Sequence, residues 1–104
     1  MIGVLVLTHG FFGEDLLKTA TGIMHDMDKT AAMNLSRRLD FETLRKNVVE
    51  KMAAINAESG ILVLIDAYGG TSYNTTLPLM KTHRICIVTG VNLPMVLSLS
   101  LIHI

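Results

Sequence analysis

The sequence is poor in the residues that build disulfides, long membrane spans and aromatic cores. Its 104 residues include one cysteine, no tryptophan and five aromatic residues, so the core must be aliphatic and rich in methionine. The lone Cys86 excludes an intrachain disulfide and favours a reducing compartment. Because it lies inside "RICIVTG", we expect it to be a small buried hydrophobe. A single domain is the natural expectation at this length.

Membrane and secretion signals are also missing. The longest uncharged run, "ICIVTGVNLPMVLSLSLI", carries Gly90, Asn92 and Pro94 near its middle, and a spanning helix tolerates that trio poorly. The apolar start "MIGVLVL" is short and lacks the basic leader of a signal peptide. We therefore expect a cytoplasmic protein.

Neither sign of charge is in excess. Nine Lys and Arg residues balance nine Asp and Glu residues, which argues against a nucleic-acid partner. The nearest basic patch, "RRLDFETLRK", is interrupted by Asp40 and Glu42. We interpret it as a solvated helix entry, with a functional basic surface as the alternative. The histidines lack metal-motif spacing, and no P-loop, G-x-G-x-x-G or G-x-S-x-G is present, so neither a metal nor a cofactor is expected.

Four apolar runs predict strands at 2–7, 31–35, 61–65 and 85–89, and three of them are continuous enough to be covered on both faces. Helical spacing between the runs predicts a first helix after Glu14 and Asp15, whose charges favour the start of a helix. Its apolar positions are Leu16, Leu17, Ala20, Ile23, Met24 and Met27.

A second helical stripe consists of Phe41, Leu44, Val48, Met52 and Ile55. We expect Asp40 to cap the start of this helix and Gly60 to stop it. A third helix is expected over about 72–81, where Pro78 either shortens or kinks it. After about residue 96 the tail "VLSLSLIHI" alternates in the manner of a strand, whereas the preceding "NLPM" is typical of a helix start. We expect the domain to be incomplete or altered there.

Alternating strands and helices predict an α/β fold, a three-layer doubly wound sheet that is mainly parallel. Right-handed crossovers give the simplest strand order, 2-1-3-4, which is the flavodoxin-like topology. In this order the second strand is added on one side of the first strand, and the third strand is added on the other side. Since ligands bind outside the carboxyl ends at such a point, "LTHG" and "LIDAYGG" should bring His9 and Asp66 together.

A carboxylate on one ring nitrogen fixes the tautomer of a histidine and leaves the other nitrogen free to react. Gly69 and Gly70 would let backbone N–H groups approach an anion, and Thr71 is a good N-cap. A nucleophilic ring beside an anion cradle suggests phosphoryl transfer. Each residue also has an ordinary structural explanation, because such histidines, aspartates and glycine pairs often serve only packing and turns; the conjunction at one edge favours a site.

Three blocks, "VLVLTHGFFGEDLLKTA", "VLIDAYGGTSYN" and "VTGVNLPM", together resemble the enzyme IIA domain of the mannose-class bacterial sugar phosphotransferase system. The resemblance implies that His9 is phosphorylated transiently by the phosphocarrier HPr and passes the group to a histidine of the IIB component. The membrane components IIC and IID would use it during sugar uptake. It also implies a homodimer, completed in the family by a further helix and an exchanged strand.

The resemblance assigns site residues as well. Asp66 matches the aspartate beside the active histidine, and Thr71 matches a hydroxyl position near the phosphoryl group. Residues that match or flank the segments shaping the site are Thr8, Gly69, Gly70, Asn74, Gly90, Asn92 and Pro94. Where this chain has Ser72 the family usually has proline. Phe11, Phe12 and Tyr68 are expected to be docking residues for HPr and IIB, with ordinary packing as the alternative.

Two further hypotheses are kept beside the phosphocarrier. One is a regulatory module of the same fold that receives phosphoryl groups or small anions as a signal, with the phosphocarrier subunit of dihydroxyacetone kinase as an intermediate case. The other is a truncated domain that keeps the motif but has lost function.

Overall fold

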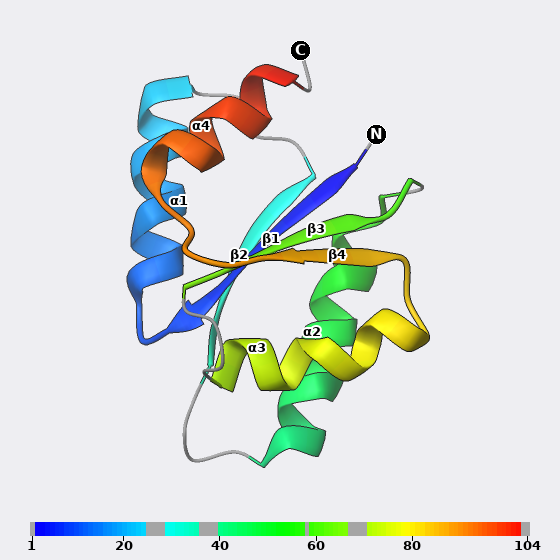
Figure 1. Cartoon of the computed structure of the whole chain (residues 1–104). Helices are drawn as coiled ribbons and strands as arrows, with labels where there is room; N and C mark the ends of the chain where they lie inside the picture. The colour runs from blue at the N-terminus through cyan, green and yellow to red at the C-terminus, as the bar shows by residue number, and fades with distance from the viewer. Residues whose placement is uncertain (1, 25–28, 36–39, 58, 67–70, 103–104) are drawn as a thin grey trace.

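The computed structural model describes residues 2–24, 29–35, 40–57, 59–66 and 71–102. Strands and helices alternate along the chain (Figure 1). They are β1 (Gly3–His9), α1 (Phe12–Met24), β2 (Thr30–Leu35), α2 (Phe41–Ile55), β3 (Ile61–Ile65), α3 (Thr71–Thr76), the 3₁₀ helix η1 (Leu77–Lys81), β4 (Ile85–Val88) and α4 (Leu93–Ile102).

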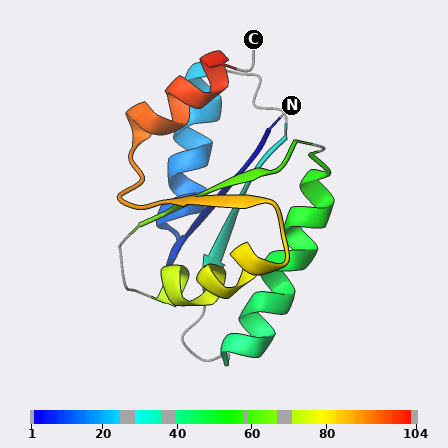
Figure 2. The same cartoon turned by 45° about the vertical axis from the view of Figure 1, so that its right-hand side comes forward.

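The strands form a parallel sheet in the order β2-β1-β3-β4, as the sequence predicts. Two helical layers enclose the sheet: α1 and α4 lie on one face, and α2 and α3 lie on the other (Figures 1 and 2). The central strand β1 is buried from Gly3 to Thr8, because both layers cover it. Its continuous apolar run is therefore the sequence signature of a strand that is covered on both faces.

Two cores lie against the two faces of the sheet. Leu44, Val48, Met52 and Ile55 of α2 pack on one face, and Ala20 of α1 and Val96 of α4 pack on the other. Four of the five positions in the predicted α2 stripe are thus confirmed as core. Phe41 is not: it lies on the first turn of α2, where the helix extends past the sheet, and it is exposed.

The first helix is confirmed in type, with Glu14 and Asp15 in its first turn. Ala20 is its buried apolar residue, whereas Ile23 is exposed near the end of the helix. The predicted position Met27 lies outside the described residues, as does His25. The apolar stripe therefore located the helix correctly but did not predict the exposure of its last turn at Ile23.

Helix ends follow local hydrogen bonding. Asp40 caps α2 as predicted, because its Oδ1 accepts a hydrogen bond of 2.7 Å from the backbone N–H of Thr43. The prediction that Gly60 stops this helix is wrong: Asn56 ends it in the left-handed conformation, with its N–H bonded to the carbonyl of Met52. Gly60, at φ +111°, instead precedes β3.

The third helix is divided at the residue before Pro78. The α-helical part ends at Thr76, and a 3₁₀ helix with the proline near its start continues to Lys81. Proline lacks the N–H that an α-helix interior requires but suits a first turn, so it shortens α3 and begins η1. Of the two outcomes left open by the sequence, shortening is the one observed.

In the last part of the chain one open question is answered and one prediction is wrong. The tail, for which the sequence offered both a strand-like alternation and a helix start, is helical: α4 continues to Ile102 and packs Val96 against the sheet. The prediction that Cys86 is buried is wrong, because its side chain is exposed. It lies on β4, an edge strand whose residues alternate between half-buried and exposed, so its apolar neighbours in sequence did not predict its environment.

Candidate functional site

The site lies where β1 and β3 end side by side. Leu7 pairs with Ile65 in the parallel register, so His9 and Asp66, which follow them along the two chains, lie at the same edge of the sheet. His9 is the last residue of β1 rather than the residue that follows it. The strand order alone therefore brings together two side chains that are 57 positions apart in sequence.

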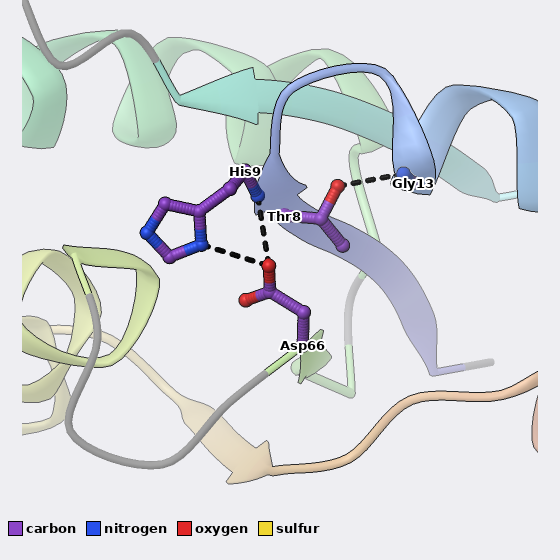
Figure 3. A network of polar contacts seen from close by, with 4 residues as sticks. All are labelled: Thr8, His9, Gly13 and Asp66. Atoms are coloured by element: carbon purple, nitrogen blue, oxygen red, sulfur yellow. Dashed lines mark hydrogen bonds and ion pairs between the residues drawn. The ribbon is translucent and has the colours of Figure 1, made fainter.

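One carboxylate oxygen of Asp66 holds His9 twice (Figure 3). Its Oδ2 lies 2.8 Å from His9 Nδ1 and accepts a second hydrogen bond of 2.9 Å from the backbone N–H of His9. The two contacts fix both the backbone position and the ring orientation. The side chains remain 30% and 19% exposed for His9 and Asp66, so the pair is accessible from the surface.

The tautomer of His9 follows from this contact. An ionised carboxylate only accepts hydrogen bonds, so Nδ1 must carry the proton and Nε2 has a free lone pair in the neutral ring. In Figure 3 the ring edge bearing the second nitrogen points away from Asp66. The arrangement presents a nucleophilic nitrogen, and the carboxylate can offset positive charge that develops on the ring.

Thr8 fixes the segment that follows the histidine. Its side chain is fully buried, and Oγ1 accepts a hydrogen bond of 2.6 Å from the backbone N–H of Gly13 in the first turn of α1. Gly10 turns the chain between strand and helix with φ +56°. A Cβ at Gly13 would lie 2.7 Å from Thr8 Oγ1, so only glycine allows this close approach. Thr8 thereby ties the start of α1 to the strand that carries His9.

The predicted anion cradle is only partly described. Gly69 and Gly70 lie outside the described residues, as does Tyr68, whereas the backbone of α3 begins at Thr71. Asn74 lies on the exposed side of α3, and its backbone carbonyl accepts a hydrogen bond of 3.3 Å from Arg45 Nη2. The carbonyl of Thr75 accepts another, of 3.2 Å, from Arg45 Nε. Arg45 therefore ties α2 to α3, a role that its helical spacing in the sequence did not reveal.

The block after β4 joins the same end of the sheet through its backbone. The N–H of Val91 donates a hydrogen bond of 3.0 Å to the carbonyl of Ile65, the residue directly before Asp66. Gly90 makes the preceding turn with φ +73°. Asn92 caps α4 through a hydrogen bond of 3.0 Å from the N–H of Met95 to its Oδ1, and Pro94 lies in the first turn.

Neither a metal centre nor a membrane span is found among the described residues. Among the described residues, no three His, Cys, Asp or Glu side chains are grouped as metal ligands would be. Within the same residues, every helix is too short or too polar to cross a bilayer.

Comparison with known proteins gives the family of the chain. A model of the EIIA-man family, described as the fructose IIA component of the phosphotransferase system (PTS), matches residues 3–103. The chain belongs to this family. It is a mannose-class enzyme IIA domain, as the three sequence blocks indicate.

Individual relatives agree with the family assignment. The mannose-specific EIIAB component of the PTS from Escherichia coli (strain K12) is 29% identical over 99 residues, which is 93% of this chain and 30% of that protein. The fructose-specific EIIA component from Bacillus subtilis (strain 168) is 28% identical over 99 residues, or 94% of this chain and 68% of that protein. The enzyme IIA domain thus spans less than a third of the Escherichia coli relative.

A solved structure supports the fold. The crystal structure of a phosphotransferase system component EIIA from Streptococcus agalactiae superposes with a TM-score of 0.84 at 24% sequence identity. The match covers 97% of this chain and 78% of that one. The doubly wound α/β architecture of this enzyme IIA domain is therefore shared with a PTS component of low sequence identity.

Proposed function

We propose that this enzyme IIA domain is a phosphocarrier that accepts a phosphoryl group from phospho-HPr on His9 and passes it to a histidine of a IIB component. The observation that carries the proposal is the hydrogen bond of 2.8 Å between His9 Nδ1 and Asp66 Oδ2. It reserves one ring nitrogen for orientation and leaves Nε2 as the nucleophile. The family assignment supports the same chemistry.

In the first transfer, Nε2 of His9 attacks the phosphorus of the donor phosphohistidine. The N–P bond of the donor breaks, an N–P bond to Nε2 forms, and the donor ring takes back its electron pair. The Nδ1 proton stays between His9 and Asp66, so the carboxylate stabilises the phosphorylated ring. Transfer to IIB repeats these bond changes with His9 as the leaving group. Such in-line transfers need positioning and charge stabilisation more than covalent assistance.

The oxygens of the phosphoryl group need donors of their own. We assign this role to the segment after Asp66, in which Gly69 and Gly70 offer backbone N–H groups and Thr71 offers a hydroxyl. The sequence pattern and the family resemblance support the assignment, and the start of α3 at Thr71 is compatible with it. Asn74 and the block Gly90, Asn92 and Pro94 form the remaining sides of the proposed phosphoryl-binding site. No metal or cofactor takes part in the proposed steps.

The proposed exchange takes place in the cytoplasm, with HPr and IIB as direct partners. The membrane components IIC and IID act downstream, when IIB delivers the phosphoryl group during sugar uptake. A homodimer of the family type is part of the proposal, and the contact between His9 and Asp66 is made within one chain.

Intact-mass measurement tests the proposal directly. The purified chain is incubated with phosphoenolpyruvate, enzyme I and HPr, beside His9→Ala and a matched control, His83→Ala. His83 is an exposed histidine whose Nδ1 contacts the hydroxyl of Thr82, away from the carboxyl ends of the strands. We expect one acid-labile phosphoryl group on wild type and on His83→Ala, and none on His9→Ala. Adding IIB should then discharge it.

The opposite results separate the remaining hypotheses. A chain that unfolds cooperatively but takes up no phosphoryl group would contradict the phosphocarrier and favour a binding module. A chain that is phosphorylated but not discharged by IIB would favour the regulatory hypothesis. A chain without a cooperative unfolding transition would support the truncated, nonfunctional domain.

A further inference from the structure

The three phenylalanines of the chain are all exposed. Phe11 is 71% exposed, Phe12 is 49% exposed and Phe41 is 45% exposed. Phenylalanine is among the residues most often buried, and an exposed ring forfeits the hydrophobic stabilisation that burial gives. Isolated exposed apolar residues are common, but the exposure of every phenylalanine in a chain whose core is aliphatic calls for a reason.

All three rings lie at the end of the molecule that carries His9. Phe11 and Phe12 stand at the start of α1, directly after β1, and Phe41 is the first residue of α2. In a parallel sheet these helix starts belong to the carboxyl edge. Because α1 and α2 cover opposite faces, their first turns flank that edge from two sides, at the end of the molecule away from the chain termini (Figures 1 and 2).

Phe41 is held in place although it is exposed. The guanidinium carbon of Arg45, one turn further along α2, lies 5.5 Å from the centre of the Phe41 ring. The same guanidinium donates hydrogen bonds to the carbonyls of Thr75 and Asn74 on α3. The ring is therefore stacked on a cation that is anchored to a second helix. An aromatic side chain fixed before binding loses little conformational entropy on binding, which is the property of an effective anchor.

We propose that Phe11, Phe12 and Phe41 form the docking surface for the phosphoryl-donor protein, with the Phe41–Arg45 pair as its anchor on the α2 side. This inference rests on the proposed function. A phosphoryl group attached to a side chain of another protein reaches His9 only when that protein covers the carboxyl edge. Its surface must then extend over the ring-bearing helix starts, so the docking surface is continuous with the phosphoryl site.

The charges beside the rings indicate the chemistry of the partner. Glu14 and Asp15 follow Phe12 in the first turn of α1, and Asp40 and Glu42 flank Phe41; apart from the half-buried Glu14, these acidic residues are exposed. Aromatic centres with a polar rim are typical of protein interfaces. Arg45 and the exposed Lys46 lie one turn further along α2 and offset the charges of Asp40 and Glu42, so the acidic side of the docking surface is the start of α1. The complementary partner surface is apolar around its phosphohistidine and carries basic residues where it faces Glu14 and Asp15. Salt should therefore weaken the encounter.

The test compares a protein donor with a small donor that needs no docking. Phosphoramidate transfers its phosphoryl group to histidine with release of ammonia, and phospho-HPr serves as the protein donor. Phe11→Ala and Phe41→Ala are measured beside Ile23→Ala, a matched control on the last turn of α1 whose side chain is 52% exposed. Because these side chains are exposed, folding should be retained, and thermal unfolding verifies it.

For each phenylalanine variant we expect KM for phospho-HPr to rise about tenfold, so that the ratio of the protein-donor rate to the phosphoramidate rate falls by the same factor. Ile23→Ala should leave this ratio at the wild-type value. Arg45→Met keeps an apolar stem over Phe41 but loses the charge and both hydrogen bonds. It should raise KM about threefold, because the ring is no longer fixed.

Unchanged ratios in Phe11→Ala and Phe41→Ala would overturn the docking proposal, and so would a phenylalanine variant that loses both rates equally. If the phenylalanine variants slow only the transfer from His9 to IIB, the docking surface does not belong to the phosphoryl donor and the proposal is overturned. If neither phospho-HPr nor phosphoramidate labels His9 of the wild-type chain, the proposed function itself fails. The two failures are thus distinguishable.

Discussion

Gly3 at the amino edge of the sheet has a different role from Gly10 and Gly90 at the carboxyl edge. A Cβ on Gly3 would lie 2.6 Å from Ile55 Cγ2 and 2.9 Å from Ala57 Cβ, so this glycine makes room for close packing. Gly10 and Gly90 have φ of +56° and +73° with no described atom within 4 Å of an added Cβ, so they serve turns. Gly3 therefore serves packing, whereas Gly10 and Gly90 let the chain turn beside His9.

This contrast separates stability from function within one small domain. At the amino edge, an added Cβ would displace neighbours at both Gly3 and Gly60. The carboxyl edge carries the His9–Asp66 pair, exposed phenylalanines and turns that are free of close contacts. Changes at the first edge should therefore act on folding, and changes at the second should act mainly on phosphoryl transfer.

The largest expected effect is on activity, at the carboxyl edge. Asp66→Asn keeps an oxygen that can accept the N–H of His9 but removes the charge that stabilises the phosphorylated ring. We expect the rate of His9 phosphorylation by phospho-HPr to fall on the order of 100-fold, since preorganised electrostatic partners are worth that much. Rapid-quench intact-mass measurement gives the rate, and thermal unfolding should show a much smaller change. A rate within twofold of wild type would mean that the carboxylate is not needed.

The largest expected effect on stability is at the amino edge. Gly3→Ala places a methyl group against Ile55 and Ala57 and should destabilise the fold by about 3 kcal/mol, as overpacking does. Gly10→Ala meets no neighbour and should lose only about 1 kcal/mol through its positive φ. Urea unfolding of both variants measures the difference. Equal losses would remove the distinction between the two edges.

Thr8→Val should lower the free energy of unfolding by an amount between those of Gly3→Ala and Gly10→Ala. The change keeps the side-chain shape but leaves the buried N–H of Gly13 without its acceptor, which costs about 2 kcal/mol. Thr75→Val is a matched control, because the hydroxyl of Thr75 is equally buried and has no hydrogen-bond partner among the described residues. It should be neutral or stabilising in the same urea titration. If both variants lose the same stability, the Thr8–Gly13 bond does not hold the start of α1.

The smallest effect concerns Asp40 and pH. Two hydrogen bonds hold the pKa of Asp40 below its ordinary value of 3.8. The larger effect comes from the backbone N–H of Thr43 and the smaller from the side chain of Thr43. A lowered folded-state pKa stabilises the fold above 3.8, and this contribution is lost as pH falls through the folded-state value. Asp40→Asn keeps a capping oxygen without the charge.

The difference in melting temperature between wild type and Asp40→Asn should therefore shrink when the pH is lowered from neutrality to below 3.8. Melting curves followed by circular dichroism at the two pH values measure this difference. A constant difference would show that the charge of Asp40 does not contribute to the cap.

Much of the fold and the centre of the site could be predicted from the sequence. Continuous apolar runs identified the strands, and the alternation of strands with helices required a parallel sheet. Right-handed connection then gave the order β2-β1-β3-β4, which brings His9 to Asp66 without any knowledge of contacts. These features follow from local periodicity and chain connectivity, which the sequence carries directly.

Other features required the folded structure. Apolar neighbours predicted burial for Cys86, but an edge strand leaves it exposed. Helical spacing placed Phe41 in the core, but its turn of α2 lies past the sheet and leaves the ring exposed. Nothing in the spacing of Arg45 predicted its bonds to the carbonyls of α3. The sequence pointed to Gly60 as the end of α2, but the helix ends at Asn56. Both residue types can take the left-handed conformation, so the type of residue alone did not locate the end.

By itself, the sequence determined the order of the strands and the histidine–carboxylate pair at their carboxyl ends, because both depend on local pattern and on the handedness of short connections. The tertiary structure alone decided which side chains around that pair are covered, how Thr8 and Arg45 hold α1 and α3, and where the exposed rings lie. The physical reason is that burial and hydrogen bonding of a side chain depend on neighbours brought close by packing, and these neighbours are distant in the sequence.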